Sequence, residues 1–222
     1  MSLLQRTFRG SCVLPRGVVR LRVAPQVLMT MAEVLDAVAL AQQLQLGQVA
    51  VIPTDTVPGL AAVAASADQI WRVKRRPADK PLILMGASET ELFDVVSPEC
   101  HHDARTLVSR HWPGALTLVL PAEGLIVERL NPAGQSLGVR IPACPLTCEL
   151  LRSTGPLATS SANPAGQPPA ASALEAAMLF PDLPQLGPQP WPTHSGQAST
   201  VVRWCGLGTW RVLRQGAVIL ES

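Results

Sequence analysis

The sequence has no tyrosine and only three phenylalanines, and aromatic residues make up 4% of it. A nucleic-acid surface built from rows of stacked rings is therefore poorly supplied. Charged residues amount to 15%, too few for a disordered or coiled-coil chain. No apolar run approaches the ~20 residues that a membrane-spanning helix needs, so we do not expect a membrane protein.

Several common site signatures are also missing. The sequence contains no G-x-x-x-x-G-K-[ST] phosphate loop, no G-x-G-x-x-G dinucleotide motif and no G-x-S-x-G nucleophile elbow. Its four histidines form no obvious acid–base pair. Cys100, His101 and His102 are adjacent, and three consecutive side chains do not all face one ion, so we expect no bound metal.

The five cysteines indicate free thiols rather than a disulfide framework. Their number is odd, and the first 30 residues lack the continuous apolar segment of a secretory signal. A reducing, cytoplasmic location is the corresponding expectation.

The length of 222 residues and the 47% content of hydrophobic residues fit one domain with a substantial core. Charge is unevenly distributed, because residues 1–28 hold five arginines and no acid. The rest of the chain has 13 basic and 16 acidic residues. We interpret residues 1–28 as a basic extension, either a frayed tail or an over-long start ahead of Met29 and Met31. An organellar transit peptide is the alternative. The folded domain is predicted at 30–221.

Apolar spacing predicts strands that alternate with helices. The predicted strands span 49–52, 81–85, 116–120, 137–141, 157–159, 199–204, 210–213 and 217–220, and residues 60–65 form a second apolar stretch. The first predicted helix starts at a Thr30–Glu33 capping box and stops at Gly47. The second runs from Asp68 to the stop at Pro77, and the third runs from an N-cap at Ser97 toward Trp112. Two more helices are predicted at 145–151 and 171–180. Residues 181–197 are predicted to be a loop. The alternation favours an α/β fold, and the closing run of strands favours a mixed sheet.

Polar residues follow the first predicted strand directly, as Pro53-Thr54-Asp55-Thr56. Ligand sites of open α/β sheets lie outside strand ends, so these hydroxyls and the carboxylate could bind a small zwitterion. The alternative is a turn in which the side chains satisfy local backbone groups.

A basic cluster follows at residues 71–80, with five bases against one acid and both lysines of the chain, Lys74 and Lys80. Arginine forks and lysine charges at this density can cradle a polyphosphate. The alternative is a solvated helix face. Farther on, Arg140 sits inside an apolar strand, where it must either pair with an acid or point at an anion. The run 159–163 supplies hydroxyl and amide groups after another strand, ahead of a turn that suits an anion.

Six segments, taken in order, resemble the motifs of the YrdC-like threonylcarbamoyl-AMP synthase family. They are Pro53-Thr-Asp-Thr56-Val-Pro-Gly59-Leu60, Lys74-x-Arg76 with Lys80-Pro81-Leu82, Trp112-Pro-Gly114 with Leu116-Thr117, Gly138-Val-Arg140-Ile-Pro142, Ser160-Ser161-Ala-Asn163 with Gly166, and Ser199-Thr200-Val-Val202. Each segment alone is a weak signal, but the ordered set over about residues 30–221 is specific.

The resemblance implies a single α/β domain, with a twisted mixed parallel and antiparallel sheet flanked by helices and a large basic cleft. It implies a synthase, a nucleotidyltransferase, that makes threonylcarbamoyl-AMP and pyrophosphate from L-threonine, bicarbonate and ATP. Other proteins would then transfer the threonylcarbamoyl group to an adenosine of tRNA. The implied ATP-binding residues are Lys74, Arg76, Lys80, Ser136, Ser161, Asn163 and Arg214. The implied threonine-binding residues are Thr56, Arg140 and Ser199, and Thr117 and Ser160 would line the cleft.

No side chain acts as a nucleophile in this implied mechanism. Lys74 and Arg76 would stabilise charge, and Mg²⁺ would be held more by ATP than by the protein. Three positions depart from the family pattern, namely Pro58 in place of an aromatic, Met85 in place of a histidine present in some members, and Arg203 in place of a common acid. The alternative is a non-catalytic RNA-binding or regulatory protein of the same fold, since fold alone does not decide function. A carbamoyl transferase fragment is disfavoured because the sequence ends after this domain.

Overall fold

The computed structural model describes residues 32–220, so the extension 1–28 and the Thr30 end of the predicted capping box lie outside the described residues. Within 32–220 ten strands form one sheet: β1 (Val34–Leu35), β2 (Ala50–Ile52), β3 (Gly59–Val63), β4 (Ile83–Met85), β5 (Leu116–Pro121), β6 (Ser136–Arg140), β7 (Leu157–Ser161), β8 (Gln185–Leu186), β9 (Thr200–Trp204) and β10 (Trp210–Arg214). The α-helices of the same residues are α1 (Ala37–Gln45), α2 (Ala67–Lys74), α3 (Glu89–Phe93), α4 (His101–His111), α5 (Leu125–Leu130), α6 (Pro145–Thr154) and α7 (Ala173–Leu179).

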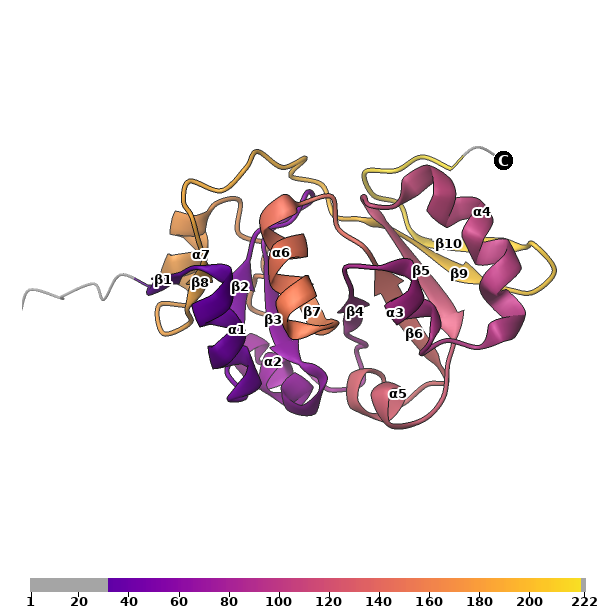
Figure 1. Ribbon diagram of the computed structural model, residues 1–222, viewed down its shortest axis with the longest axis horizontal. Coiled ribbons are helices and arrows are strands. Elements are labelled where there is room, and N and C mark those ends of the chain that lie inside the picture. Colours follow the sequence, from indigo (N-terminus) through magenta and orange to yellow (C-terminus); the bar gives the residue numbers. More distant parts are fainter. Residues whose placement is uncertain (1–31, 221–222) are drawn as a thin grey trace, which may run out of the picture.

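The sheet is mixed, and its order is β1-β8-β2-β3-β7-β4-β6-β5-β9-β10 (Figure 1). Four neighbouring pairs are parallel, namely β1 with β8, β8 with β2, β4 with β6, and β5 with β9. The other pairs are antiparallel. The prediction of one α/β domain with a mixed sheet is confirmed.

Helices cover both faces of the β2–β3–β7 part of the sheet. On one face α1 and α6 lie side by side, and their leucines pack against Ile52 and Ala61 (Figure 1). The opposite face packs against α2 and α7 through residues such as Ile70 and Ala176. Each fully buried leucine contributes about 2 kcal/mol, so apolar burial fixes these layers.

The part of the sheet around β5 and β6 has one packed face and one hollowed face. Leu116, Leu118 and Leu120 are fully buried and belong to the same core cluster as Val108 of α4. Because side chains alternate along a strand, Thr117 and Val119 point to the other face. There they line a hollow together with residues of β6, β9 and β10. This second face therefore has room for a ligand.

Two predicted elements differ from the structure. The first helix begins at Ala37, not at Thr30, because the Asp36 side chain accepts a hydrogen bond from the Ala39 N–H at 2.8 Å and caps it, while Val34 and Leu35 pair with β8 as a strand. The predicted strand 217–220 is absent from the described residues. The chain there is held instead by the Thr200 hydroxyl, which accepts from the N–H of Gly216 and of Val218.

Smaller differences concern short elements. Ser97 makes no side-chain cap, and the 3₁₀ helix Pro98–Cys100 precedes α4. Helix α2 ends at Lys74, before Pro77, where Arg75 adopts a left-handed conformation. The predicted loop 181–197 contains β8, and the sequence patterns missed α3 and α5. None of the helices in residues 32–220 is long and apolar enough to cross a membrane.

Candidate functional site

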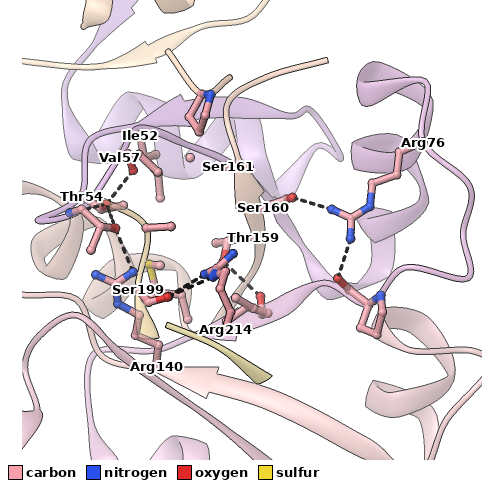
Figure 2. Close-up of a pocket in the computed structure, with 17 residues that line it drawn as sticks. Ile52, Thr54, Val57, Arg76, Arg140, Thr159, Ser160, Ser161, Ser199 and Arg214 are labelled. Carbon is pink, nitrogen blue, oxygen red and sulfur yellow. Dashed lines mark hydrogen bonds between the residues drawn. The ribbon is translucent and has the colours of Figure 1, made fainter. Parts of the chain in front are cut away.

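A cavity of about 210 Å³ lies where the ends of several strands meet (Figure 2). Its walls come from β2, β3, β4, β6, β7 and β10 and from the loops beside them. The lining residues are Ile52, Thr54, Thr56, Val57, Gly59, Arg76, Pro81, Ile83, Met85, Arg140, Thr159, Ser160, Ser161, Pro169, Ala198, Ser199 and Arg214. The lining has arginine and hydroxyl groups but no Asp or Glu side chain, so it suits an anion.

The loop between β2 and β3 is both a local turn and a cavity wall. The Thr54 hydroxyl accepts from the Thr56 N–H at 3.1 Å and donates to the Val57 carbonyl at 2.6 Å. Since the hydroxyl proton of Thr54 is used in the bond to Val57, the Thr56 hydroxyl donates to the Thr54 hydroxyl oxygen in the 2.9 Å contact between the two threonines. Thr56 Oγ1 also accepts from Arg140 at 3.0 Å. One lone pair of Thr56 remains for a donor in the cavity.

Arg140 both pairs with an acid and lines the cavity, and these are the two alternatives that its place in an apolar strand left open. It is 4% exposed, pairs with Asp55 at 2.7 Å, donates from Nε to the Gly114 carbonyl at 2.8 Å, and still lines the cavity. Three of its five N–H groups are used by protein acceptors, so one on each terminal nitrogen remains for a ligand. Burial lowers the pKa of Arg140 below its ordinary value, and the nearby charge of Asp55 offsets part of this lowering. An arginine stays charged in this situation.

Arg214 and Ser199 form a second group on the same side of the cavity (Figure 2). Arg214 donates to the Ser199 carbonyl from Nε at 3.1 Å and from Nη2 at 2.9 Å. The Ser199 hydroxyl lies 2.9 Å from the hydroxyl of Thr117, which is fully buried. The register of β10 against β9 shifts between Val212 and Arg214. Such a bulge re-aims the side chain that follows it, here the arginine of the cavity.

Arg76 lies on the other side of Ser160 (Figure 2). It donates to the Ser160 hydroxyl at 3.2 Å and, more weakly, to the Pro81 carbonyl at 3.4 Å. Its Nε is buried without a hydrogen-bond partner in the structure. Within residues 32–220 neither Arg76 nor Arg214 forms an ion pair with a carboxylate. Both charges are therefore available to an anionic ligand.

Lys74 lies directly behind this wall. Its side chain is almost fully buried, and Nζ donates to the Ser161 carbonyl at 2.5 Å, the Asn163 carbonyl at 2.7 Å and Asn163 Oδ1 at 3.1 Å. Burial, and secondarily the charge of Arg76, lowers the pKa of Lys74 to about 8. Asn163 Oδ1 also accepts from the Ser161 hydroxyl at 2.6 Å.

A second hollow of about 220 Å³ adjoins the cavity and shares Pro81, Ile83 and Arg214 with it. Thr117, Ser136 and Arg203 are among its other lining residues. Sites for larger ligands usually enclose ~300–1,000 Å³. The cavity alone suits a small molecule, and only the two spaces together suit a nucleotide beside it.

The structure thus gathers most of the predicted site residues. The ones that line the cavity are Thr56, Arg76, Arg140, Ser160, Ser161, Ser199 and Arg214. Thr117 and Ser136 line the second hollow, and Lys74 and Asn163 lie behind the wall. Lys80 is exposed and lines neither space. The ligand assigned to each residue stays a prediction.

Sequence reasoning missed several wall residues. Ile52 and Ile83 belong to strands whose apolar patterns predict only core positions. Pro169 and Ala198 belong to loops with no distinctive motif.

The Cys100–His102 run has structural partners. The Cys100 thiol donates to the Ser97 carbonyl, and burial raises its pKa to about 11. The His101 ring stacks on Phe93. Within residues 32–220 no group of three or more His, Cys, Asp or Glu side chains could hold a metal ion. The four cysteines described there, which exclude Cys12, are free.

The chain is similar to one family model and to several known proteins. The Sua5/YciO/YrdC family model, described as "Telomere recombination", matches residues 42–216. The threonylcarbamoyl-AMP synthase of Bacillus subtilis is 40% identical over 126 residues, which are 54% of this chain and 36% of that protein. A putative threonylcarbamoyl-AMP synthase of Mycobacterium tuberculosis H37Rv is 35% identical over 179 residues, 79% of this chain and 81% of that protein.

A solved structure of Pyrococcus abyssi Sua5 complexed with L-threonine superimposes with a TM-score of 0.75 at 30% identity. The match covers 84% of this chain and 57% of the Pyrococcus chain. The chain therefore spans about a third of the Bacillus relative and just over half of the Pyrococcus one. The family resemblance read from the six sequence motifs is confirmed, and the chain belongs to the Sua5/YciO/YrdC family.

Proposed function

We propose that this protein is an L-threonylcarbamoyladenylate synthase, a nucleotidyltransferase that converts L-threonine, bicarbonate and ATP into threonylcarbamoyl-AMP, pyrophosphate and water. The observation that carries this proposal is the convergence of Arg76, Arg140 and Arg214 on one cavity without an acidic lining residue. Relatives named threonylcarbamoyl-AMP synthase support it. So does the relative solved with L-threonine.

L-Threonine would bind at Thr56, Arg140 and Ser199. The two free N–H groups of Arg140 match a carboxylate, which accepts two parallel hydrogen bonds from a guanidinium. The remaining lone pair of Thr56 suits the amino group. Ile52 and Met85 give the cavity an apolar surface for the methyl group of the substrate.

ATP would extend from the cavity into the second hollow. Arg76 and Arg214 would bind the phosphates, with Lys80 at the rim and the charge of Lys74 behind the wall. Ser161 and Asn163 would shape the wall next to the phosphates. Ser136, which lines the second hollow, would contact the nucleoside portion.

The reaction needs no protein nucleophile. The amine of threonine attacks bicarbonate and releases water to form a carbamate. A carbamate oxygen then attacks the α-phosphorus of ATP, the bond to the bridging oxygen breaks, and pyrophosphate leaves. Catalysis would rest on positioning and on neutralising the phosphate charge, for which arginine and hydroxyl groups are suited. Mg²⁺ would be bound by the ATP phosphates, because no carboxylate lines the cavity.

The product is a reactive mixed anhydride, so a partner must take it up before water destroys it. We propose that this partner is a tRNA-modifying complex that acts on an adenosine. A direct contact of this chain with tRNA or double-stranded RNA is the basis of the alternative, RNA-binding function.

The purified full-length protein, incubated with ATP, Mg²⁺, radiolabelled bicarbonate and L-threonine, tests the proposal. The expected result is pyrophosphate release that depends on threonine, together with a labelled adenylate identified by mass spectrometry. Release that is equal with and without threonine would overturn the proposal. An inactive protein that binds RNA would favour the alternative instead.

A further inference from the structure

We propose that Lys74 is a positioning residue that clamps the loop after β7, and through it Ser161, instead of contacting the nucleotide itself. The assignment rests on the proposed function, because Ser161 faces the cavity in which ATP would bind. It concerns residues 161–165, which leave the end of β7 and return toward α2.

The hydrogen bonds of the ammonium group are all used inside the protein. A lysine ammonium has three N–H groups and no acceptor. In Lys74 these three groups meet the carbonyl oxygens of Ser161 and Asn163 and the side-chain oxygen of Asn163. No N–H is left for a phosphate unless one of these bonds breaks.

The backbone of Lys74 holds the same loop at a second point. Its carbonyl accepts from the N–H of Ala165 at 2.9 Å. Because α2 ends here with Arg75 in the left-handed conformation, the chain turns away immediately after Lys74. The end of the helix and the loop after β7 are therefore joined through both the main chain and the side chain of one residue.

The clamp reaches the cavity through a short relay of hydrogen bonds. Asn163 Oδ1 accepts from Lys74 and from the Ser161 hydroxyl, so the ammonium fixes the amide and the amide fixes the hydroxyl proton. The other end of the amide donates to the Gln167 carbonyl at 2.6 Å, which prevents a flip. Ser161 is left with its oxygen lone pairs for the cavity, at one fixed orientation.

The environment of the ammonium contains no counterion. Within residues 32–220 Lys74 forms no ion pair, and its surroundings are carbonyl oxygens and Arg76. Burying an unpaired charge is unfavourable, and the lowered pKa of Lys74 reflects that cost. The charge is retained near neutral pH because three oxygens solvate it in place of water. Lys80, by contrast, is exposed to solvent.

The Lys74→Arg variant distinguishes a positioning role of Lys74 from a direct contact of its side chain with the nucleotide. A planar guanidinium binds phosphate well but does not aim three N–H groups at oxygens that surround one nitrogen. We expect Lys74→Arg to bind ATP about tenfold more weakly than the wild type and to show a reduced kcat, as Lys74→Met does. Recovery of wild-type ATP affinity and kcat in Lys74→Arg would overturn the proposal.

A double-mutant cycle provides a second test that compares folded variants with one another. Asn163→Ala removes the relay, so adding Lys74→Met to it should weaken ATP binding less than about threefold further, because the two residues act as a unit. The matched control is Lys80→Met, whose fold-change in the Kd for ATP should multiply with the fold-change caused by Asn163→Ala. If the fold-changes of Lys74→Met and Asn163→Ala also multiply, the two residues act independently and the relay is contradicted.

Nuclear magnetic resonance of the wild-type protein gives a readout that needs no variant to fold. With ¹⁵N-labelled lysine the chain gives only two ammonium signals, from Lys74 and Lys80. The expected result is slow proton exchange for Lys74 and fast exchange for Lys80, and equal exchange rates would refute the clamp. A protected Lys74 in a protein without threonine-dependent pyrophosphate release would refute the proposed function while leaving the clamp intact.

Discussion

The carboxylate of Asp55 lies 2.7 Å from Nη2 of Arg140, and the same oxygen accepts the backbone N–H of Ala143 at 3.0 Å. One oxygen thus joins the loop after β2 to the end of β6 and to the segment that follows. The side chains of the pair are 16% and 5% exposed. Asp55 therefore sets the direction in which the remaining N–H groups of Arg140 point.

Asp55→Ala should destabilise the fold as well as the site. Removing one partner of a buried ion pair leaves an uncompensated charge, which costs about 3–5 kcal/mol. Urea unfolding measures the change in the free energy of unfolding. Asp68→Ala is the matched control, because its ion pair with Arg72 is exposed and should contribute less than ~1 kcal/mol. Equal losses in the free energy of unfolding of the two variants would contradict the larger contribution expected for the buried Asp55–Arg140 pair.

Thr56→Val should affect threonine more than ATP. The replacement keeps the shape of the side chain but removes the oxygen that accepts from Arg140 and faces the cavity. We expect the KM for threonine to rise about tenfold and the KM for ATP to change by less than about twofold, since one lost hydrogen bond to a charged group is worth ~1.5–3 kcal/mol. Steady-state pyrophosphate release measures both constants, and Thr106→Val on the exposed surface of α4 is the control. A similar rise in the two constants would contradict the assignment of Thr56.

Arg214→Gln should weaken ATP binding by about 10–100-fold, because a charge-assisted contact with phosphate is lost. The effect on threonine binding should be smaller. Calorimetric titration with ATP in the absence of threonine measures it. Arg211→Gln provides the comparison, since Arg211 is an exposed arginine of the same strand and lines neither the cavity nor the second hollow. If Arg211→Gln loses as much affinity, the effect reflects overall charge and not the bulge-directed position of Arg214.

ATP affinity should fall as the pH rises through about 8. Burial lowers the pKa of Lys74 to about 8 from its ordinary 10.5, so the free protein releases this proton in mildly alkaline solution. The anionic ligand favours the charged form, and the Kd should therefore rise by up to about tenfold per pH unit above pH 8. Calorimetry between pH 7 and 9.5 tests this, and Lys74→Met should show a flatter profile.

The pH dependence of folding stability has the opposite sign. The unfolded chain keeps the Lys74 proton to higher pH than the folded chain does. The contribution of Lys74 to the free energy of unfolding therefore improves from about pH 8 toward 10.5.

Much of the fold could be predicted because several of its strands lie in segments of mainly apolar residues. The apolar run at 49–52 predicts β2, and Leu137 to Ile141 predicts β6. The two-residue strands β1 and β8 are too short for any pattern, since they exist only through pairing with each other and with β2. Helix α3 has a recognisable start in the sequence, because Ser88 and Glu91 form a capping box.

The site was predicted through motif order more than through local chemistry. A strand pattern with one arginine does not say whether Arg140 pairs with an acid or faces a ligand, and in the structure it does both. The burial of Lys74 was unpredictable from a cluster in which Arg72, Arg75 and Lys80 are exposed. Three-dimensional contacts with Ser161 and Asn163, 87 and 89 positions away in sequence, decide its environment.

The last two strands of the sheet carry Arg214 and follow directly on Ser199. Among residues 32–220, Val202 is the one buried hydrophobic side chain that follows Ser199 in the sequence. Removing the chain from Ser199 onward would therefore leave nearly all buried apolar side chains in place, while Ser199 and Arg214 would be lost from the cavity wall.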